Sequence, residues 1–180
     1  MSMAPFSRFW GAARERPPWE DGPLIYSLLR EWDGNGPHQL LIGAASTSGN
    51  HASQSTGGHG EPSVADLVQR VLNALKRLVH KNDDKRRIEL YRVALRVPIF
   101  RCADELLDTL RRQDVVGPKD VRPHARWLIK VAAHREPLLL GVALLGLAGT
   151  KEDVLDLQVI GKHNDFSPLV VLAIKNLLGE

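Results

Sequence analysis

The amino-acid sequence predicts an all-α fold, a right-handed α-solenoid of stacked antiparallel helix pairs that follows an irregular N-terminal segment. Two observations lead to this prediction. Apolar residues recur at helical spacing along residues 62–180, and the apolar stretch at residues 137–149 is followed about 30 positions later by a similar stretch. A third observation divides the chain, because residues 43–60 carry no charged side chain and consist mostly of Gly, Ser, Ala and Thr.

The composition is that of a globular protein. The chain has 180 residues, of which 43% are hydrophobic and 25% are charged, and this is enough to form a sizeable core. The single cysteine, Cys102, excludes an intramolecular disulfide and favours a reducing compartment, so we expect a cytoplasmic protein. Residues 1–10 contain no sustained apolar run after a basic start, and no secretory signal peptide is therefore expected.

Residues 137–149, PLLLGVALLGLAG, contain no charged side chain. A membrane-spanning helix needs about 20 apolar residues, and this shorter stretch is bounded by Arg135 and Glu136 on one side and by the charged residues 151–153 on the other. We therefore expect no membrane contact. A helix that is apolar on all sides is normally surrounded by other helices in a protein interior, so we expect this stretch to be enclosed by neighbouring helices.

A similar stretch recurs at residues 168–179, PLVVLAIKNLLG. Pro137 lies 31 positions before Pro168, and Gly149 lies 30 positions before Gly179. Because proline suits the first turn of a helix and glycine the position after its end, both stretches carry the same start and stop signals. Each is preceded by a segment with Gly, then Lys, an acidic residue and Val, and then an amphipathic run. This pattern predicts two antiparallel helices in each repeat.

A repeat of this length, with Pro at a helix start, a downstream Ala-aliphatic pair and a terminal Leu-Gly or Ala-Gly, resembles the short HEAT-like repeats of the PBS-lyase type. The resemblance covers residues 101–180 and is weaker over residues 62–100. It implies stacked helix pairs with an extended surface that binds other chains. The arginine that such repeats carry early in the first helix is replaced here by the aliphatic residues 138–140 and 169–171, which make this face more apolar than usual.

Three more helices are expected upstream. Residues 63–80 place eight apolar side chains on one helical stripe, with Ser63 as the N-cap and Asp66 as the acid of a capping box. Residues 83–97 form a second helix, and residues 102–112 form a third. Together with the four helices of the two repeats, seven helices are predicted.

The sequence predicts three parts. They are an irregular, aromatic-rich segment with one short helix at LIYSLLREW (residues 1–42), a flexible Gly/Ser linker (residues 43–60) and the HEAT-like repeat domain (residues 61–180). The aromatic side chains of the first part either pack back on the helices or form a docking motif that orders on meeting a partner. In the second case Trp10, Trp19 and Trp32 are expected to contact that partner.

No catalytic centre is recognisable. The sequence contains no phosphate-binding loop, nucleophile elbow or zinc-ligand spacing. His124, His134 and His163 fall near predicted helix ends, where a cationic or capping role is expected. Arg101 would lower the pKa of the Cys102 thiol, but a packed side chain is the simpler interpretation. We therefore expect no catalytic residue, no metal and no cofactor, and a non-enzymatic role is favoured.

Basic residues concentrate in the middle of the chain. Residues 61–135 hold seventeen basic and ten acidic side chains, and the basic density is highest at residues 76–96. A helix-helix turn there would present a basic cluster to phosphates or to an acidic protein. The simpler interpretation is that these side chains only keep an outer face of the solenoid in water. The side chains expected to bind nucleic acid are Arg77, Lys81, Lys85, Arg86 and Arg87.

Two functions are expected from these patterns. The first is a non-catalytic protein-protein interaction scaffold or adaptor, whose apolar C-terminal end binds another protein or a second copy of the chain. Leu169, Leu172 and Leu177 are the contacts expected there, and the sequence leaves open whether they are interface or core. The alternative is a nucleic-acid-binding helical repeat protein that uses the basic region and is related to the HEAT-like DNA glycosylases.

Overall fold

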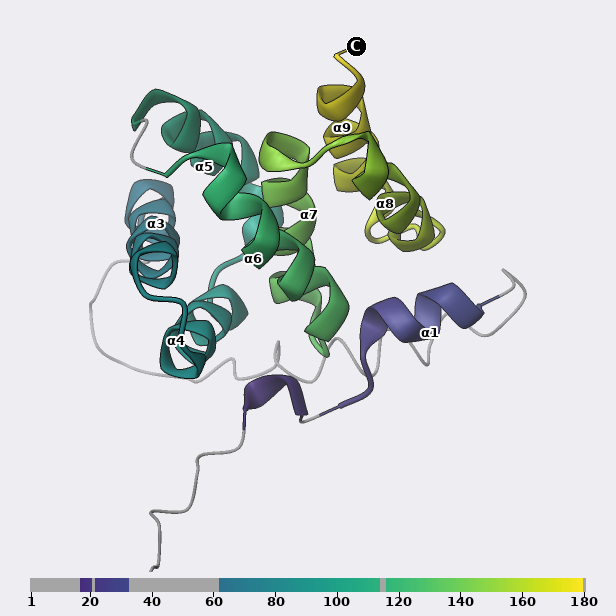
Figure 1. Cartoon of the computed structure of the whole chain (residues 1–180), viewed down its shortest axis with the longest axis horizontal. Coiled ribbons are helices and arrows are strands. Elements are labelled where there is room, and N and C mark those ends of the chain that lie inside the picture. Colours follow the sequence, from purple (N-terminus) through teal and green to yellow (C-terminus); the bar gives the residue numbers. More distant parts are fainter. Residues whose placement is uncertain (1–16, 21, 33–61, 114–115, 180) are drawn as a thin grey trace, which may run out of the picture.

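The computed structural model describes residues 17–20, 22–32, 62–113 and 116–179, and over these ranges the fold is all-helical, with no strand (Figure 1). The predicted all-α class is therefore confirmed, as are the seven α-helices predicted after residue 62. The elements follow one another as η1 (Pro18–Glu20), α1 (Ile25–Glu31), α3 (Val64–His80), α4 (Asp84–Leu95), α5 (Ile99–Gln113), α6 (Pro118–Val131), α7 (Arg135–Ala148), η2 (Lys151–Asp153), α8 (Val154–Gly161) and α9 (Ser167–Leu178).

Local signals explain three of the helix ends. The Ser63 hydroxyl accepts a hydrogen bond from the Asp66 backbone N–H, and the Asp66 carboxylate accepts one from the Ser63 N–H, so the predicted capping box is present. The Asp83 carboxylate caps α4 by accepting from the Arg86 N–H at 2.9 Å. α9 ends at Gly179, whose φ of 76° lies in the left-handed region that glycine adopts without strain.

The start of α5 depends on a contact from another helix. α5 begins at Ile99, three residues before the predicted start. The carboxylate of Glu136, in the first turn of α7, accepts a hydrogen bond from the Ile99 N–H at 2.7 Å. This hydrogen bond satisfies a backbone donor that a helix leaves free at its N-terminus. Because the acceptor lies on α7, the sequence around Ile99 does not reveal this contact.

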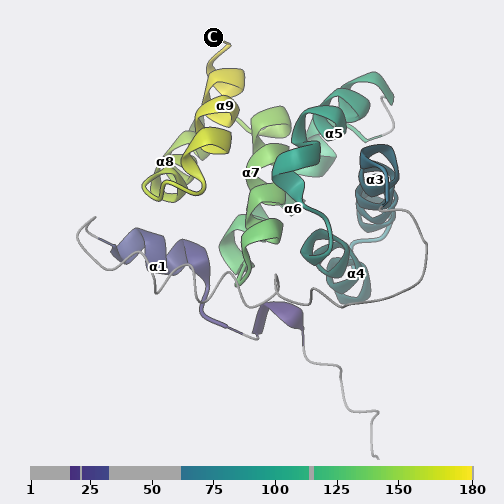
Figure 2. The same cartoon turned by 180° about the vertical axis from the view of Figure 1, so that it is seen from behind.

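Four helices form a row in which each contacts the next, in the order α3, α5, α7 and α9. α4 packs on α3 and α7, α6 packs on α7, and α8 packs on α9. The N-terminal helix α1 contacts both α6 and α8 (Figures 1 and 2). The first part of the chain therefore contributes a helix to the packing of the later helices.

The apolar stretch of α7 lies at the centre of the core. α7 contacts α4, α5, α6 and α9, and every residue from Pro137 to Gly146 is buried. The prediction that neighbouring helices surround this stretch is confirmed. None of the helices in the described ranges is long and apolar enough to cross a membrane.

Helix α1 is attached to the rest of the fold by apolar and polar contacts. Its Ile25, Tyr26 and Leu29 are buried in the core. The Ile25 N–H donates to the Ala132 carbonyl at 2.9 Å, so the end of α6 supplies an acceptor for the start of α1. The predicted linker at residues 43–60 lies outside the described residues.

Candidate functional site

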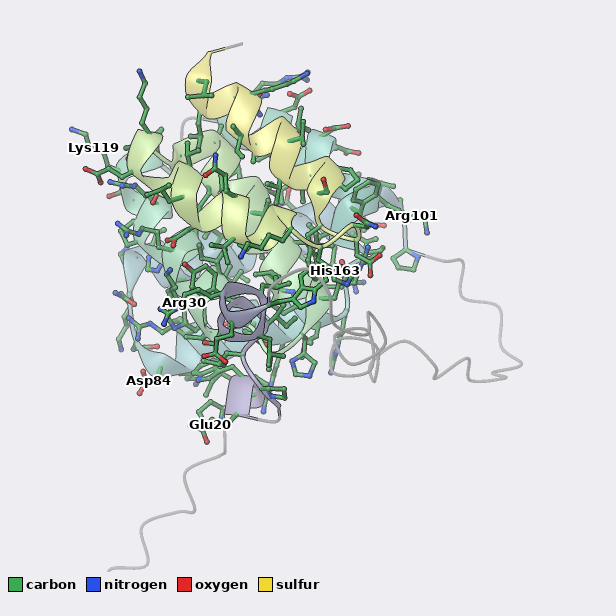
Figure 3. All side chains as sticks on the ribbon, turned by 90° about the vertical axis from the view of Figure 1, so that its right-hand side faces the viewer. Glu20, Arg30, Asp84, Arg101, Lys119 and His163 are labelled. Carbon is green, nitrogen blue, oxygen red and sulfur yellow. The ribbon has the colours of Figure 1, made fainter. Side chains whose placement is uncertain are left out.

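Most of the exposed large hydrophobic side chains in the described part of the chain lie on α8 and α9. They are Leu155 on α8 and Val171, Leu172 and Leu178 on α9, and the fifth, Phe100, lies apart from them at the start of α5. Their exposed fractions run from 39% for Leu172 to 71% for Leu155. Figure 3 looks onto the end formed by α8 and α9, which lie side by side toward the viewer. Eight exposed residues of this end form the α8–α9 face: Leu155, Gln158, Lys162, Val171, Leu172, Lys175, Asn176 and Leu178.

The three leucines expected to contact a partner have different environments. Leu169 is buried in the core, and Leu177 is half-buried against it. Leu172 is exposed. The rotation of α9 about its axis explains the difference, because Ala173 faces α7 and the stripe that includes Leu169 and Leu177 turns inward with it. Leu172 is therefore the one of the three that belongs to the α8–α9 face.

Sequence reasoning missed Leu155, Val171 and Leu178. A signal for the last two was present, since Val171, Lys175 and Leu178 are spaced by four and three positions and so share one side of a helix. Because lysine is rarely buried, Lys175 indicates that this side of the helix faces water. Leu155 has no such signal, because only the packing of α8 on α1 and α9 leaves it outside.

Two glycines allow α9 to approach its neighbours closely. A Cβ atom on Gly146 of α7 would lie 2.8 Å from the Ala173 Cα, and one on Gly161 of α8 would lie 2.9 Å from the Val170 Cγ1. Neither position has room for a larger side chain without movement of α9. These contacts hold α9 between α7 and α8, so the orientation of the α8–α9 face is set by the core.

An ion-pair cluster attaches the segment before α8 to α6. Asp153 is fully buried, and its Oδ2 accepts from the Arg122 Nε and from the Thr150 N–H, each at 2.8 Å. The Arg126 Nε lies 3.4 Å from the other carboxylate oxygen. The hydrogen bond from Arg122 to Asp153, followed by that to Glu152, raises the pKa of the Arg122 guanidinium.

A second polar contact joins α1, α6 and α8. The Asp156 carboxylate accepts hydrogen bonds from the Tyr26 hydroxyl and from the Lys130 Nζ, the latter at 2.7 Å. Lys130 also lies over the Tyr26 ring, 3.6 Å from its centroid. Burial alone would raise the pKa of Asp156, but the hydrogen bonds from Lys130 and Tyr26 outweigh it and lower the pKa.

The predicted basic cluster is brought together at the turn between α3 and α4. Arg77 and Arg86 both pair with Glu89, the second at 2.8 Å. The hydrogen bond from Arg86 is the largest cause of the lowered pKa of Glu89. Lys81 lies 3.5 Å from the Asp83 carboxylate.

The remaining two members of the basic cluster differ from each other. Arg87 donates to the Asn82 side chain at 3.1 Å, lies 3.9 Å from the Asp84 carboxylate and stacks over Trp127 at 5.7 Å. Lys85 is exposed in the first turn of α4. Four of the five side chains therefore have a carboxylate partner within the chain, which reduces the positive charge that they present to water.

A groove of about 1430 Å³ lies between η1, α3 and α4. Its described lining contains four basic and four acidic side chains, among them Lys85 and Arg92 on one hand and Asp84 and Glu89 on the other. A mixed lining of this kind does not select anions over cations. The described charges of the groove therefore balance.

Two of the three tryptophans expected to bind a partner make contacts inside the chain. Trp19 lies edge-on to Tyr91 and Trp127, with ring centroids 5.6 Å and 5.2 Å away. Trp32 lies 5.9 Å from the His163 ring. Both are half-buried against the core, so packing back on the helices is the alternative observed for them. Trp10 lies outside the described residues.

The position predicted for His124 is wrong. α6 continues through Pro123, which is exposed, so His124 lies in the helix interior and is buried. Burial lowers the pKa of His124 from its ordinary value of 6.5, Arg87 lowers it further, and Asp120 opposes both. The neutral ring is therefore the form that the core accommodates.

The other two histidines lie at helix ends, as predicted. His134 is the N-cap residue of α7, but its side chain does not cap the helix. Its Nδ1 lies 3.0 Å from the Tyr91 hydroxyl, which accepts from the Ala133 N–H at 3.0 Å. His163 is buried in the turn after α8, and its Nδ1 accepts from the Asp165 N–H at 3.3 Å.

Replacing His124 by leucine is expected to reduce the loss of stability on acidification. Because its pKa is lowered in the folded state, the unfolded chain binds the proton more readily, so stability falls as the pH drops below the unfolded value of 6.5. At a pH about one unit below the unfolded pKa, the loss of stability caused by His124 is at most about 1.4 kcal/mol. Urea denaturation at about pH 7.5 and pH 5.5 measures it. Asn176→Leu, which places the same residue at an exposed position and removes no titratable group, is the control and should retain the wild-type pH dependence.

Cys102 is a packed side chain. It is buried, and its Sγ lies 3.6 Å from the Pro98 and Ile99 carbonyls. Burial, followed by the nearby Glu136 carboxylate, raises the thiol pKa, opposite to the lowering expected from Arg101. No group of three or more His, Cys, Asp and Glu side chains in the described ranges is arranged to hold a metal ion.

Comparison with known proteins adds no family to this description. No protein-family model matches the chain, and neither the curated proteins nor the solved structures contain a match. The resemblance to HEAT-like repeats stays a prediction.

Proposed function

We propose that this chain is a non-catalytic protein-interaction scaffold of HEAT-like helix pairs that binds a partner protein through the α8–α9 face. One observation carries the proposal: four of the five large hydrophobic side chains exposed in the described part of the chain lie on α8 and α9. Clustered apolar side chains on a protein surface are typical of sites that bind another molecule.

The arrangement of the helices supports the repeat part of the proposal. A row in which α3, α5, α7 and α9 each contact the next is expected of a right-handed solenoid of stacked pairs. α7 and α9 also correspond in sequence, since both carry a proline in the first turn and a glycine at the C-cap. A cytoplasmic location belongs to the same proposal, and the unpaired thiol of Cys102 supports it.

Leu172→Asp is expected to leave the fold intact and to weaken partner binding strongly. Leu172 is exposed, so an aspartate there stays hydrated and should change the free energy of unfolding by about 0.5 kcal/mol or less. A charge placed in an apolar contact should reduce binding by about tenfold or more. Affinity-tagged wild-type and variant chains are expressed in the source cells, and the proteins that co-purify are quantified by mass spectrometry.

The matched control is Phe100→Asp, which places the same charge at an exposed hydrophobic position outside the face. The proposal requires at least one protein that the Phe100 variant retains and the Leu172 variant loses. Leu155→Asp, at the most exposed of these positions, should lose the same protein. An identical set of co-purified proteins in all four samples would contradict the proposal.

The nucleic-acid alternative is tested on the same purified chain. Fluorescence anisotropy with labelled duplex DNA and single-stranded RNA measures binding from low to physiological salt. Binding in the micromolar range with a steep salt dependence, lost on reversing the charges of Arg77, Lys81, Arg86 and Arg87, would favour that alternative. The internal pairing of these four side chains with carboxylates argues for the scaffold instead.

A further inference from the structure

The charge of the α8–α9 face differs in sign from that of the segment that forms it. Residues 136–180 hold three basic and six acidic side chains. The face carries two lysines, Lys162 and Lys175, and none of its eight residues has a carboxylate. The net negative charge of the segment therefore lies elsewhere.

Contacts with other elements explain where the carboxylates are. Glu136 accepts from the α5 backbone, Asp153 and Glu152 pair with Arg122 on α6, and Asp156 binds Lys130 and Tyr26. Asp165 lies in the turn between α8 and α9, beside His163. Glu180 lies outside the described residues. Because these carboxylates serve contacts within the fold or lie beside His163, the charged residues left on the α8–α9 face are Lys175 on α9 and Lys162 directly after α8.

Lys175 lies within the apolar part of the face. It is four positions after Val171, three after Leu172 and three before Leu178, so all four share one side of α9. A binding partner that covers these apolar side chains must also cover Lys175 or place a group of opposite charge beside it. At the end of α8, the Lys162 Nζ donates to the Trp32 carbonyl at 3.4 Å.

We infer that the α8–α9 face binds an amphipathic helix of a partner protein, with apolar side chains along one stripe and carboxylates along its flanks. This inference rests on the proposed function and specifies the chemical class of the partner. The apolar residues of an amphipathic helix recur at spacings of three and four positions, and such a stripe packs against the apolar side chains of another helix. Flanking carboxylates pair with Lys162 and Lys175 and set the orientation of the helix.

A second copy of the chain fits the face less well. A symmetric dimer places the same surface of both chains in contact. Two α8–α9 faces would therefore bring four lysines into one interface, and the face offers no carboxylate to pair with them. Like charges that are removed from water in this way oppose association.

A membrane surface also fits less well. Helices that lie in a membrane interface turn their whole apolar stripe to the lipid and carry several basic residues on the other side. The main apolar stripe of α9, with Leu169, Val170 and Ala173, is buried in the core instead. The four large apolar side chains that remain exposed on α8 and α9 are enough to contact one helix of a partner protein.

Two synthetic peptides test the inference on the full-length chain. Each is a fluorescein-labelled helix of three heptads with leucine at the a and d positions and alanine at b, c and f. The e and g positions are glutamate in one peptide and lysine in the other, and both residues favour helices similarly. At about 50 mM salt, where exposed charges are weakly screened, we expect the Kd of the glutamate peptide to be about tenfold lower, as two exposed ion pairs would produce.

Charge variants show where each peptide binds. Lys162→Glu combined with Lys175→Glu should reverse the preference, so that the lysine peptide binds more tightly. The control combines Lys85→Glu with Lys119→Glu, which makes the same charge change at exposed positions on α4 and α6 and should keep the wild-type preference. Leu172→Asp should weaken the binding of both peptides.

Four results would overturn the inference: equal binding of the peptides, no binding of either, a dimer in sedimentation that Leu172→Asp dissociates, or binding to phosphatidylglycerol vesicles that the glutamate peptide does not displace. Failure of the inference is distinguishable from failure of the proposed function. If the peptides fail but Leu172→Asp still loses its co-purified protein, the scaffold proposal stands and only the chemistry assigned to the partner is wrong.

Discussion

Replacing Gly146 by leucine is expected to lower the free energy of unfolding by about 3 kcal/mol or more, because α7 and α9 are in direct contact at this position. Even a Cβ atom on Gly146 would lie 2.8 Å from the Ala173 Cα and 2.9 Å from its Cβ. The nearest atom belongs to the backbone, so α9 itself must move to make room. Urea denaturation followed by circular dichroism measures the change.

The repeat provides a matched control for this substitution. Asn176 of α9 lies 30 positions after Gly146 and is exposed. Asn176→Leu should therefore change stability by about 0.5 kcal/mol or less. Gly146→Ala should also lose stability, although alanine is favoured over glycine in a helix by about 1 kcal/mol. Leucine that is tolerated equally well at both positions would show that α9 does not pack on α7 as described.

Replacing Asp153 by alanine is expected to cost about 3 kcal/mol of stability, because removing a buried carboxylate leaves its hydrogen-bond donors without an acceptor. The carboxylate is fully buried, and its loss leaves Arg122 without the acceptor that lies 2.8 Å away. The Thr150 N–H loses its acceptor as well. The substitution therefore weakens the attachment of the segment before α8 to α6, and thermal or urea unfolding detects it.

Glu152→Ala is the control for the Asp153 variant. Glu152 pairs with the same arginine at 3.0 Å, but its side chain is 80% exposed. An exposed pair contributes little because water and salt screen it, so the expected change is about 0.5 kcal/mol or less. Equal losses from the two variants would mean that burial of Asp153 does not determine the strength of the pair.

Much of the local structure was predictable from short stretches of sequence. Ser63 and Asp66 identify a helix start because their bonds join residues three positions apart. Gly179 marks a helix end because few other residues adopt a positive φ. The continuous apolar character of α7 indicated a helix enclosed by others, since no side of it suits water.

The candidate site was predictable only in part. Leu172 was identified, but Leu169, from the same group, is buried. The residues of the predicted basic cluster lie around the α3–α4 turn, but the pairing of Arg77 with Glu89 joins two helices and could not be deduced from the spacing along either of them. His124 was misplaced because Pro123 does not interrupt α6.

By itself, the sequence determined the helical class, most of the helix limits and the enclosed position of α7, because the responsible interactions act within a few residues of each other. The tertiary structure decided the rest. It placed α1 against α6 and α8, turned Asp153 and Asp156 toward α6, and left Lys175 among the exposed apolar residues of α9. These outcomes depend on contacts between residues far apart in the chain, and such contacts form only when the helices pack.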